Sequence, residues 1–150
     1  MIPPLAAHGL LPPGEHCCSL VEAEQCFATS AHRKQLWNNL LLALKTMRDK
    51  GLSGSLVVDG SYVTDKPLPD DIEVSLDARG QPDTIQGLAV IFHLSPQAQT
   101  LREQHKVSFH ATIDGAHDFT LFFQYLGPKS AKIKGLNRRH PKGVLRIFEW

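Results

Sequence analysis

Two acidic residues with one residue between them, Asp71 and Glu73, are the most direct candidates for catalysis in this sequence. Glu73 lies in Ile72–Asp77 (IEVSLD), whose alternation of apolar and polar residues predicts a half-buried strand, and Asp71 directly precedes it and could extend it. Strand residues two apart point to the same face, so both carboxylates would converge on one side of the sheet. Such carboxylates repel each other unless a cation lies between them, and one or two carboxylates commonly hold Mg²⁺ together with substrate phosphates. The spacing favours a metal site; the alternative is a solvated pair of charges.

A Gly-Ser turn precedes these acids. The apolar segment Ser55–Asp59 predicts a buried strand, and Gly60 and Ser61 follow it directly. Glycine adopts backbone conformations that other residues resist, and the N–H groups and hydroxyl of such a turn can bind phosphate. Lys66, on the following loop, is a candidate for reaching a triphosphate, with a solvated lysine as the alternative. A metal site beside a phosphate-binding turn is the arrangement used for phosphoryl or nucleotidyl transfer.

This combination resembles the nucleotidyltransferase fold of the DNA polymerase β superfamily, especially its minimal, short-chain members. Their pattern is a strand, Gly-Ser, a loop, and then Asp-x-Asp or Asp-x-Glu on the next strand. Here nine residues separate Gly60-Ser61 from Asp71-x-Glu73. The segments IPPL, HGLLPPGEH, LVVDGSYVTDKPLPDDIEV and HPKGVLRI also resemble a family of short bacterial and phage proteins that is described as nucleotidyltransferase-like and of unassigned function.

The resemblance implies that Gly60 and Ser61 contact nucleotide phosphates and that Asp71 and Glu73 hold Mg²⁺ or Mn²⁺. It implies transfer of a nucleoside monophosphate from a nucleoside triphosphate to a hydroxyl of a protein, an RNA or a small molecule, within a toxin–antitoxin or phage-defence pair. Active members carry a third acidic residue on a later strand, where this sequence has Ser108. The alternative is therefore a catalytically impaired module that binds nucleotide, nucleic acid or a partner protein, as an antitoxin does. Whether the chain is an enzyme stays open.

The predicted elements form one domain over residues 1–150, of the α+β (or α/β) class, with a small mixed sheet flanked by helices. A strand over 107–113 would place Ser108 and His110 on one face, which makes His110 a candidate general base or a structural histidine. The longest helix, over 31–50, has one apolar stripe and is predicted to cover the core. Residues 1–16, with four prolines, predict an extended arm that packs on the domain. Further helices are expected over 20–27, 84–94, 96–105 and 119–126.

The composition is that of an ordinary globular protein, with 42% hydrophobic residues and a net charge of +1. No apolar stretch reaches the length of a membrane span, and the N-terminal segment lacks the basic start of a signal peptide, so we expect a cytoplasmic protein without membrane contact. The sequence does not indicate an oligomeric state. A basic tail is a candidate for binding nucleic acid, although no aromatic residue alternates with its cations to stack on bases: Lys129, Lys132, Lys134, Arg138, Arg139 and Lys142.

Overall fold

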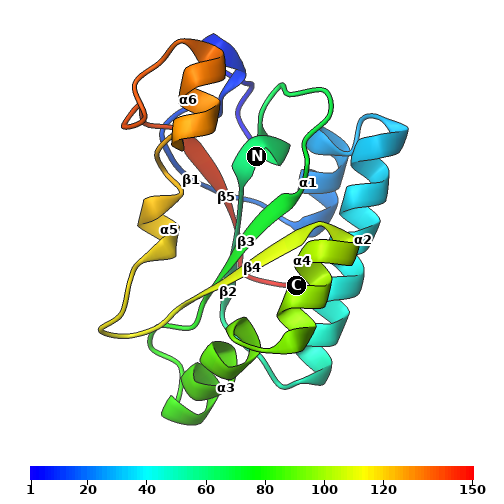
Figure 1. The fold of residues 1–150 in the computed structure, drawn as a ribbon, viewed down its shortest axis with the longest axis vertical. Coiled ribbons are helices and arrows are strands. Elements are labelled where there is room, and N and C mark those ends of the chain that lie inside the picture. Colours follow the sequence, from blue (N-terminus) through cyan, green and yellow to red (C-terminus); the bar gives the residue numbers. More distant parts are fainter.

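A five-stranded mixed sheet with six α-helices makes up the computed structural model, which describes all residues from 1 to 150 (Figure 1). The strands are β1 (Gly14–Cys17), β2 (Ser55–Asp59), β3 (Ile72–Asp77), β4 (Val107–Thr112) and β5 (Gly143–Ile147). The helices are α1 (Leu20–Phe27), α2 (Ala31–Asp49), α3 (Asp83–His93), α4 (Pro96–His105), α5 (Phe119–Phe122) and α6 (Pro128–Lys134). The predicted α+β class with a small mixed sheet is confirmed.

The strand order is β1-β5-β2-β3-β4, with β2 at the centre. Strand β2 pairs antiparallel with both of its neighbours, whereas β3 and β4 are parallel, as are β1 and β5. A parallel pair needs a long connection, and α3 and α4 supply it between β3 and β4. The register places Asp59 opposite Glu73 and Glu73 opposite Ser108, so three polar side chains stand in one row across three strands.

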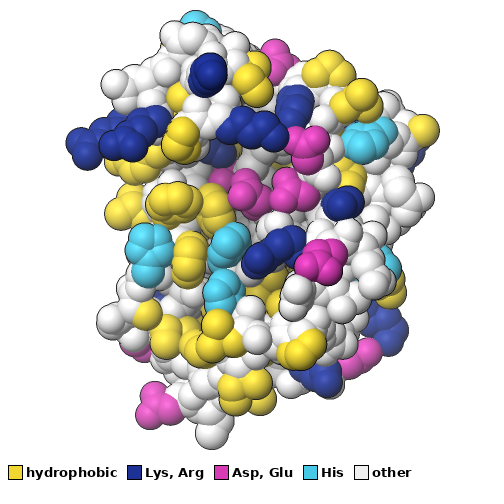
Figure 2. All heavy atoms as spheres, in the orientation of Figure 1, with side chains coloured by type: hydrophobic (Ala, Val, Ile, Leu, Met, Phe, Trp, Pro, Cys, Tyr) yellow, Lys and Arg dark blue, Asp and Glu magenta, His cyan; other side chains and the backbone are white.

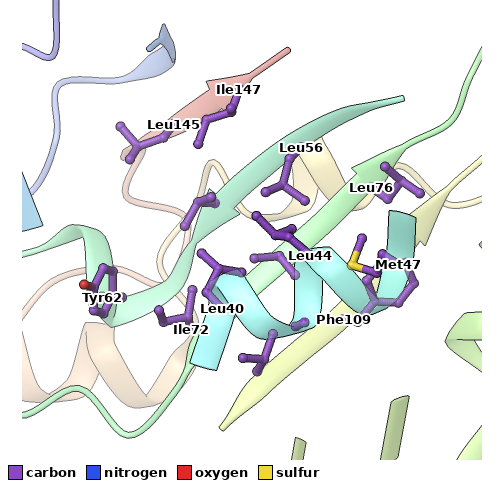
Figure 3. Packing of buried hydrophobic residues seen from close by; sticks show 14 of the residues in the cluster. Leu40, Leu44, Met47, Leu56, Tyr62, Ile72, Leu76, Phe109, Leu145 and Ile147 are labelled. Atoms are coloured by element: carbon purple, nitrogen blue, oxygen red, sulfur yellow. The ribbon is translucent and has the colours of Figure 1, made fainter. Parts of the chain in front are cut away.

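The main hydrophobic core lies between α2 and one face of the sheet (Figure 3). Leu40, Leu44 and Met47 of α2 are essentially inaccessible to solvent, as the predicted apolar stripe requires. They pack against residues that alternate along the strands, among them Leu56, Ile72, Leu76, Phe109, Leu145 and Ile147. Because strand side chains alternate between faces, the intervening residues point to the opposite face, which α5 covers only in part.

One buried arginine fixes the loop that leads to the acidic pair. The guanidinium of Arg33 donates to the carbonyl oxygens of Phe27 and Lys66, at 2.6 and 2.7 Å, and to that of Tyr62. Ser30 caps the start of α2 by accepting the backbone N–H of Arg33 at 3.2 Å. The N-terminus of α2 and the segment after the Gly-Ser turn are thus held together by one side chain.

The proline-rich arm packs on the domain as predicted, with Ile2, Leu10 and Leu11 buried. Its last residues also form β1, which the sequence pattern does not indicate, because four residues are too few to show alternation. The expected helix over 119–126 is shorter than predicted: α5 ends at Phe122, and Gly127-Pro128 starts the separate helix α6. No helix combines the length and the apolar character needed to cross a membrane.

Candidate functional site

The predicted acids do converge, on the sheet face opposite α2. Glu73 lies in β3 between Asp59 of β2 and Ser108 of β4, and Asp71 directly precedes β3. The hydroxyl of Ser108 donates to Oδ2 of Asp71 at 2.9 Å. Ser108 therefore occupies the strand position next to the acidic pair, where the resemblance calls for a third carboxylate, and contributes a hydrogen bond to one acid. Figure 2 shows acidic side chains gathered near the middle of this face.

The electrostatics of the row centre on Glu73. Burial, together with the nearby carboxylates of Asp59 and Asp71, raises the pKa of Glu73 to about 7, while the ammonium group of Lys142 acts in the opposite direction. Near neutral pH this carboxyl group therefore exchanges readily between its protonated and ionised forms. A bound cation would offset the negative charge of Glu73 as the proton does, so the neighbouring carboxylates favour either a proton or a cation there.

Asp59 and Lys142 form a buried ion pair at the end of the row. Their Oδ1 and Nζ atoms are 2.5 Å apart, and the side chains are only 1% and 7% exposed. Lys142 precedes β5 and is fixed by its backbone N–H, which donates to the carbonyl of Gln124. The sequence does not indicate this pair because its partners are 83 residues apart. The one available signal was that both residues lie in segments of the family resemblance.

The Gly-Ser turn lies against Glu73. Gly60 has a φ of +81°, and a Cβ added there would lie 2.6 Å from Oε2 of Glu73. Both the backbone conformation and the close carboxylate therefore require glycine. Ser61 follows in the 3₁₀ turn Gly60–Val63 and is half-buried. The structure thus brings Gly60, Asp71 and Glu73 together, with Ser61 adjoining them.

Replacing Gly60 by alanine is expected to destabilise the fold by more than the roughly 1–2 kcal/mol that a left-handed backbone costs an ordinary residue, because the new methyl group also displaces the Glu73 carboxylate. Gly80 provides the matched control, since its φ is +74° and a Cβ there meets nothing within 4 Å. Urea unfolding of both alanine variants measures the difference. Equal losses of stability would show that the contact with Glu73 costs nothing.

Lys66 lies at the rim of the site. Its ammonium group is 2.9 Å from Oδ2 of Asp70, and Lys129 approaches the same oxygen at 3.5 Å. Lys66 is the first cause of the lowered pKa of Asp70, and Lys129 adds to it. Lys66 thus neutralises the acid next to Asp71 and has no direct contact with the row itself.

One large cavity does not coincide with the acids. About 710 Å³ in volume, it lies between the proline-rich arm and the start of α2, and Arg33 and Lys66 are among its lining residues. The guanidinium of Arg33 is already engaged with three backbone carbonyls, so this cavity has no free buried charge for a ligand. We therefore locate the candidate site at the acidic row, on the sheet face opposite α2.

His110 is separated from the acids by its surroundings. It lies on the same face as Ser108, but its ring neighbours are Phe119 and Phe123, at centroid distances of 4.8 and 5.1 Å. Burial, together with the charges of His93 and Arg102, lowers the pKa of His110 to about 4. His110 is accordingly neutral near pH 7 and belongs to an aromatic cluster beside the acids.

The donor set limits what metal could bind. No group of three or more His, Cys, Asp or Glu side chains is placed so that it could hold a metal ion. Asp71 and Glu73 provide two carboxylates, which fits a cation that takes its remaining ligands from water and substrate phosphates. The chemistry of these residues therefore fits a hard cation such as Mg²⁺ or Mn²⁺ that keeps several water ligands, and does not fit a closed structural site.

Comparison with known protein families gives one match, which covers almost the whole chain. A family of unknown function, DUF6932, matches residues 3–148. The comparison with curated proteins found no match, and neither did the comparison with solved structures. The match includes the Gly-Ser turn, the acidic pair, Ser108 and Lys142. The chain therefore belongs to the DUF6932 family.

Proposed function

We propose that this protein is a metal-dependent nucleotidyltransferase with a minimal nucleotidyltransferase fold. The observation that carries the proposal is the position of Glu73, which lies against the Gly60 turn and beside Asp71, with a pKa raised to about 7. Two carboxylates beside the Gly-Ser turn, whose Ser61 is half-buried, can serve both the metal and the phosphates of a nucleoside triphosphate. The family resemblance supports the same assignment.

In this proposal each part of the site has a separate task. Asp71 and Glu73 hold Mg²⁺ or Mn²⁺, which when bound supplies positive charge to the phosphate oxygens. The Gly60-Ser61 turn binds the phosphates through its N–H groups and the Ser61 hydroxyl. Ser108 orients the Asp71 carboxylate through its hydrogen bond. Burial raises the pKa of Asp59, and Lys142 opposes that shift and adds a positive charge to the site behind Glu73.

The reaction would be an in-line displacement at the α-phosphorus. The acceptor hydroxyl oxygen forms a bond to that phosphorus, the bond to the bridging oxygen of the β-phosphate breaks, and pyrophosphate leaves while the hydroxyl proton passes to water. The protein accelerates such a step mainly by positioning and by electrostatic stabilisation. The acceptor can be a hydroxyl of a protein, an RNA or a small molecule, in the setting of a toxin–antitoxin or phage-defence pair.

Replacing Asp71 by asparagine is expected to lower the transfer of label from α-³²P nucleoside triphosphates by at least about 100-fold, because a ligand for the metal and its charge are both lost. Asp70→Asn is the matched control: its carboxylate is one residue away but exposed and paired with Lys66. The assay uses purified protein, each of the four triphosphates, Mg²⁺ or Mn²⁺, and cell lysate as a source of acceptors. Equal activity of wild type and Asp71→Asn would refute the metal role.

A second function is favoured by one specific observation. Ser108 replaces the third acid, and no group of three acidic side chains is arranged for metal binding. A regulatory module that binds nucleotide, nucleic acid or a partner protein without turnover fits this incomplete set. Calorimetric titration with a triphosphate separates the two functions, because the module binds nucleotide while no label is transferred under any metal condition.

A further inference from the structure

The C-terminal part of the chain has a strong excess of positive charge. Residues 119–148 contain seven Lys and Arg and no Asp or Glu, although the whole chain has a net charge of only +1. Three of these cations are paired with acids at 3.1 Å or less: Lys134 with Asp65, Lys142 with Asp59, and Arg146 with Glu15 and Asp77. Lys129 approaches Asp70 at 3.5 Å.

Three cations of this segment have no acidic partner: Lys132, Arg138 and Arg139. Lys132 lies in the last turn of α6, and the two arginines lie on the exposed turn that follows, where the backbone N–H of His140 donates to the carbonyl of Asn137. Three exposed cations without counter-ions, close together along the chain, create a local positive potential that attracts polyanions.

Aromatic side chains lie close to these cations, although they precede them in the sequence. Phe122 and Tyr125 are 58% and 45% exposed, and the exposed ring of His117 packs edge-on against Phe122 at 5.7 Å. The backbone joins them to the cations: Tyr125 forms an isolated bridge with Pro141, and the N–H of Leu126 donates to the carbonyl of His140. The basic stretch itself has no aromatic residue on which bases could stack. Phe122 of α5 and Tyr125, which follows α5, therefore supply these rings.

This basic and aromatic surface adjoins the acidic row. Lys129 of α6 reaches Asp70, the residue before Asp71, and Phe123 packs on Val57 and Val144 on the same sheet face as Glu73. In Figure 2, Lys and Arg side chains occupy the upper part of the face, hydrophobic and histidine side chains lie below them, and the acidic group lies beside both. A ligand lying along the surface would thus extend directly to the acids.

We infer that this surface, formed by Lys132, Arg138, Arg139, Phe122 and Tyr125, binds single-stranded nucleic acid. Cations that follow a phosphate backbone, combined with exposed rings on which unpaired bases stack, are the chemistry by which proteins hold single strands. An acidic polypeptide would satisfy the cations but leave the aromatic rings without a partner, and a duplex presents no open base faces. The strand would enter with its terminal hydroxyl at Asp71 and Glu73, an acceptor role that rests on the proposed function.

Fluorescence anisotropy of the full chain with labelled single-stranded RNA and DNA tests the surface, in EDTA and without nucleotide. The triple variant Lys132→Ala/Arg138→Ala/Arg139→Ala is expected to bind at least about tenfold more weakly, and the slope of log K against log salt is expected to fall by about 2 if each cation contacts one phosphate. The double variant Phe122→Ala/Tyr125→Ala is expected to lose on the order of tenfold in affinity without a change in slope. Melting curves verify that each variant is folded.

The control triple variant Lys34→Ala/Arg48→Ala/Lys50→Ala removes the same charge from exposed positions at α2, on the other side of the sheet, and is expected to bind like wild type. An equal loss in this control, duplex binding as tight as single-strand binding, or equal competition by polyglutamate would overturn the proposal; the last result would identify an acidic protein as the partner. Binding by the wild-type protein without any label transfer under Mg²⁺ or Mn²⁺ would leave the surface standing and refute only the transferase.

Discussion

Replacing Glu73 by glutamine is expected to make the metal-free protein more stable at pH 8 and, at the same time, to abolish nucleotidyl transfer. The pKa of Glu73 is raised to about 7 from a reference value of 4.5, so the folded state retains a proton that the unfolded chain has already lost. Stability from this group is therefore complete at low pH and is lost as the pH rises from about 4.5 to about 7. Above that range the ionised, buried carboxylate costs on the order of 3 kcal/mol, which glutamine removes.

Urea unfolding in EDTA at pH 5 and pH 8 measures this effect. We expect the stability gain of Glu73→Gln to be on the order of 2 to 3 kcal/mol at pH 8 and to shrink below about 1 kcal/mol at pH 5. The exposed Glu24 on α1 provides the control, because Glu24→Gln should change stability by less than about 0.5 kcal/mol at either pH. A gain that is the same at both pH values, or a Glu73→Gln protein that still transfers label, would contradict the assigned role.

Replacing Lys142 by methionine is expected to lower the free energy of unfolding by about 3–5 kcal/mol, because the buried Asp59 carboxylate loses its only cation. The cost arises from the partner that remains, and so it should be largely recovered in the double variant Asp59→Asn/Lys142→Met, in which neither charge is present. Chemical denaturation of the two variants and of wild type at pH 7 gives the comparison.

The exposed pair Lys45–Asp49 is the matched control for this experiment. Its atoms are 2.8 Å apart, but the side chains are 67% and 63% exposed, so Lys45→Met should cost less than about 1 kcal/mol. If Lys142→Met costs no more than Lys45→Met, Asp59 is not ionised in the folded protein. A double variant as unstable as the single one would show that Lys142 stabilises the fold through the packing of its side chain and not through its charge.

The local features of the site were predictable from the sequence, whereas its long-range features were not. Alternation over Ile72–Asp77 predicts the strand, which is present, whereas Asp71 lies just before it and is near Glu73 through Ser108, which bonds to its carboxylate. The apolar stripe of α2 likewise follows from its spacing. Periodicity records only which neighbours along the chain share a face, so it cannot indicate which strands pair. The row formed by Asp59, Glu73 and Ser108 depends on that pairing.

The remaining differences also have physical causes. The Asp59–Lys142 pair requires β5 to lie beside β2, and β5 has no alternating pattern because all five of its residues are buried. The helix that the apolar run over 119–126 predicts is interrupted because Phe123 turns toward Val57 and Val144 on the sheet. In both places, packing between elements distant in the sequence determines the structure, and the local sequence pattern does not reveal it.

The pairing of β1 with β5 has a consequence for the order in which the molecule assembles. Strand β5 lies between β1 and β2, so a nascent chain that lacks residues 142–147 has a gap in its sheet and no cation for Asp59. Contacts between residues this far apart in the chain close late and slow the folding reaction. During synthesis from the N-terminus, the acidic row would therefore stay incomplete until Lys142 emerges, and the activity we propose for it could begin only after the last strand has been inserted.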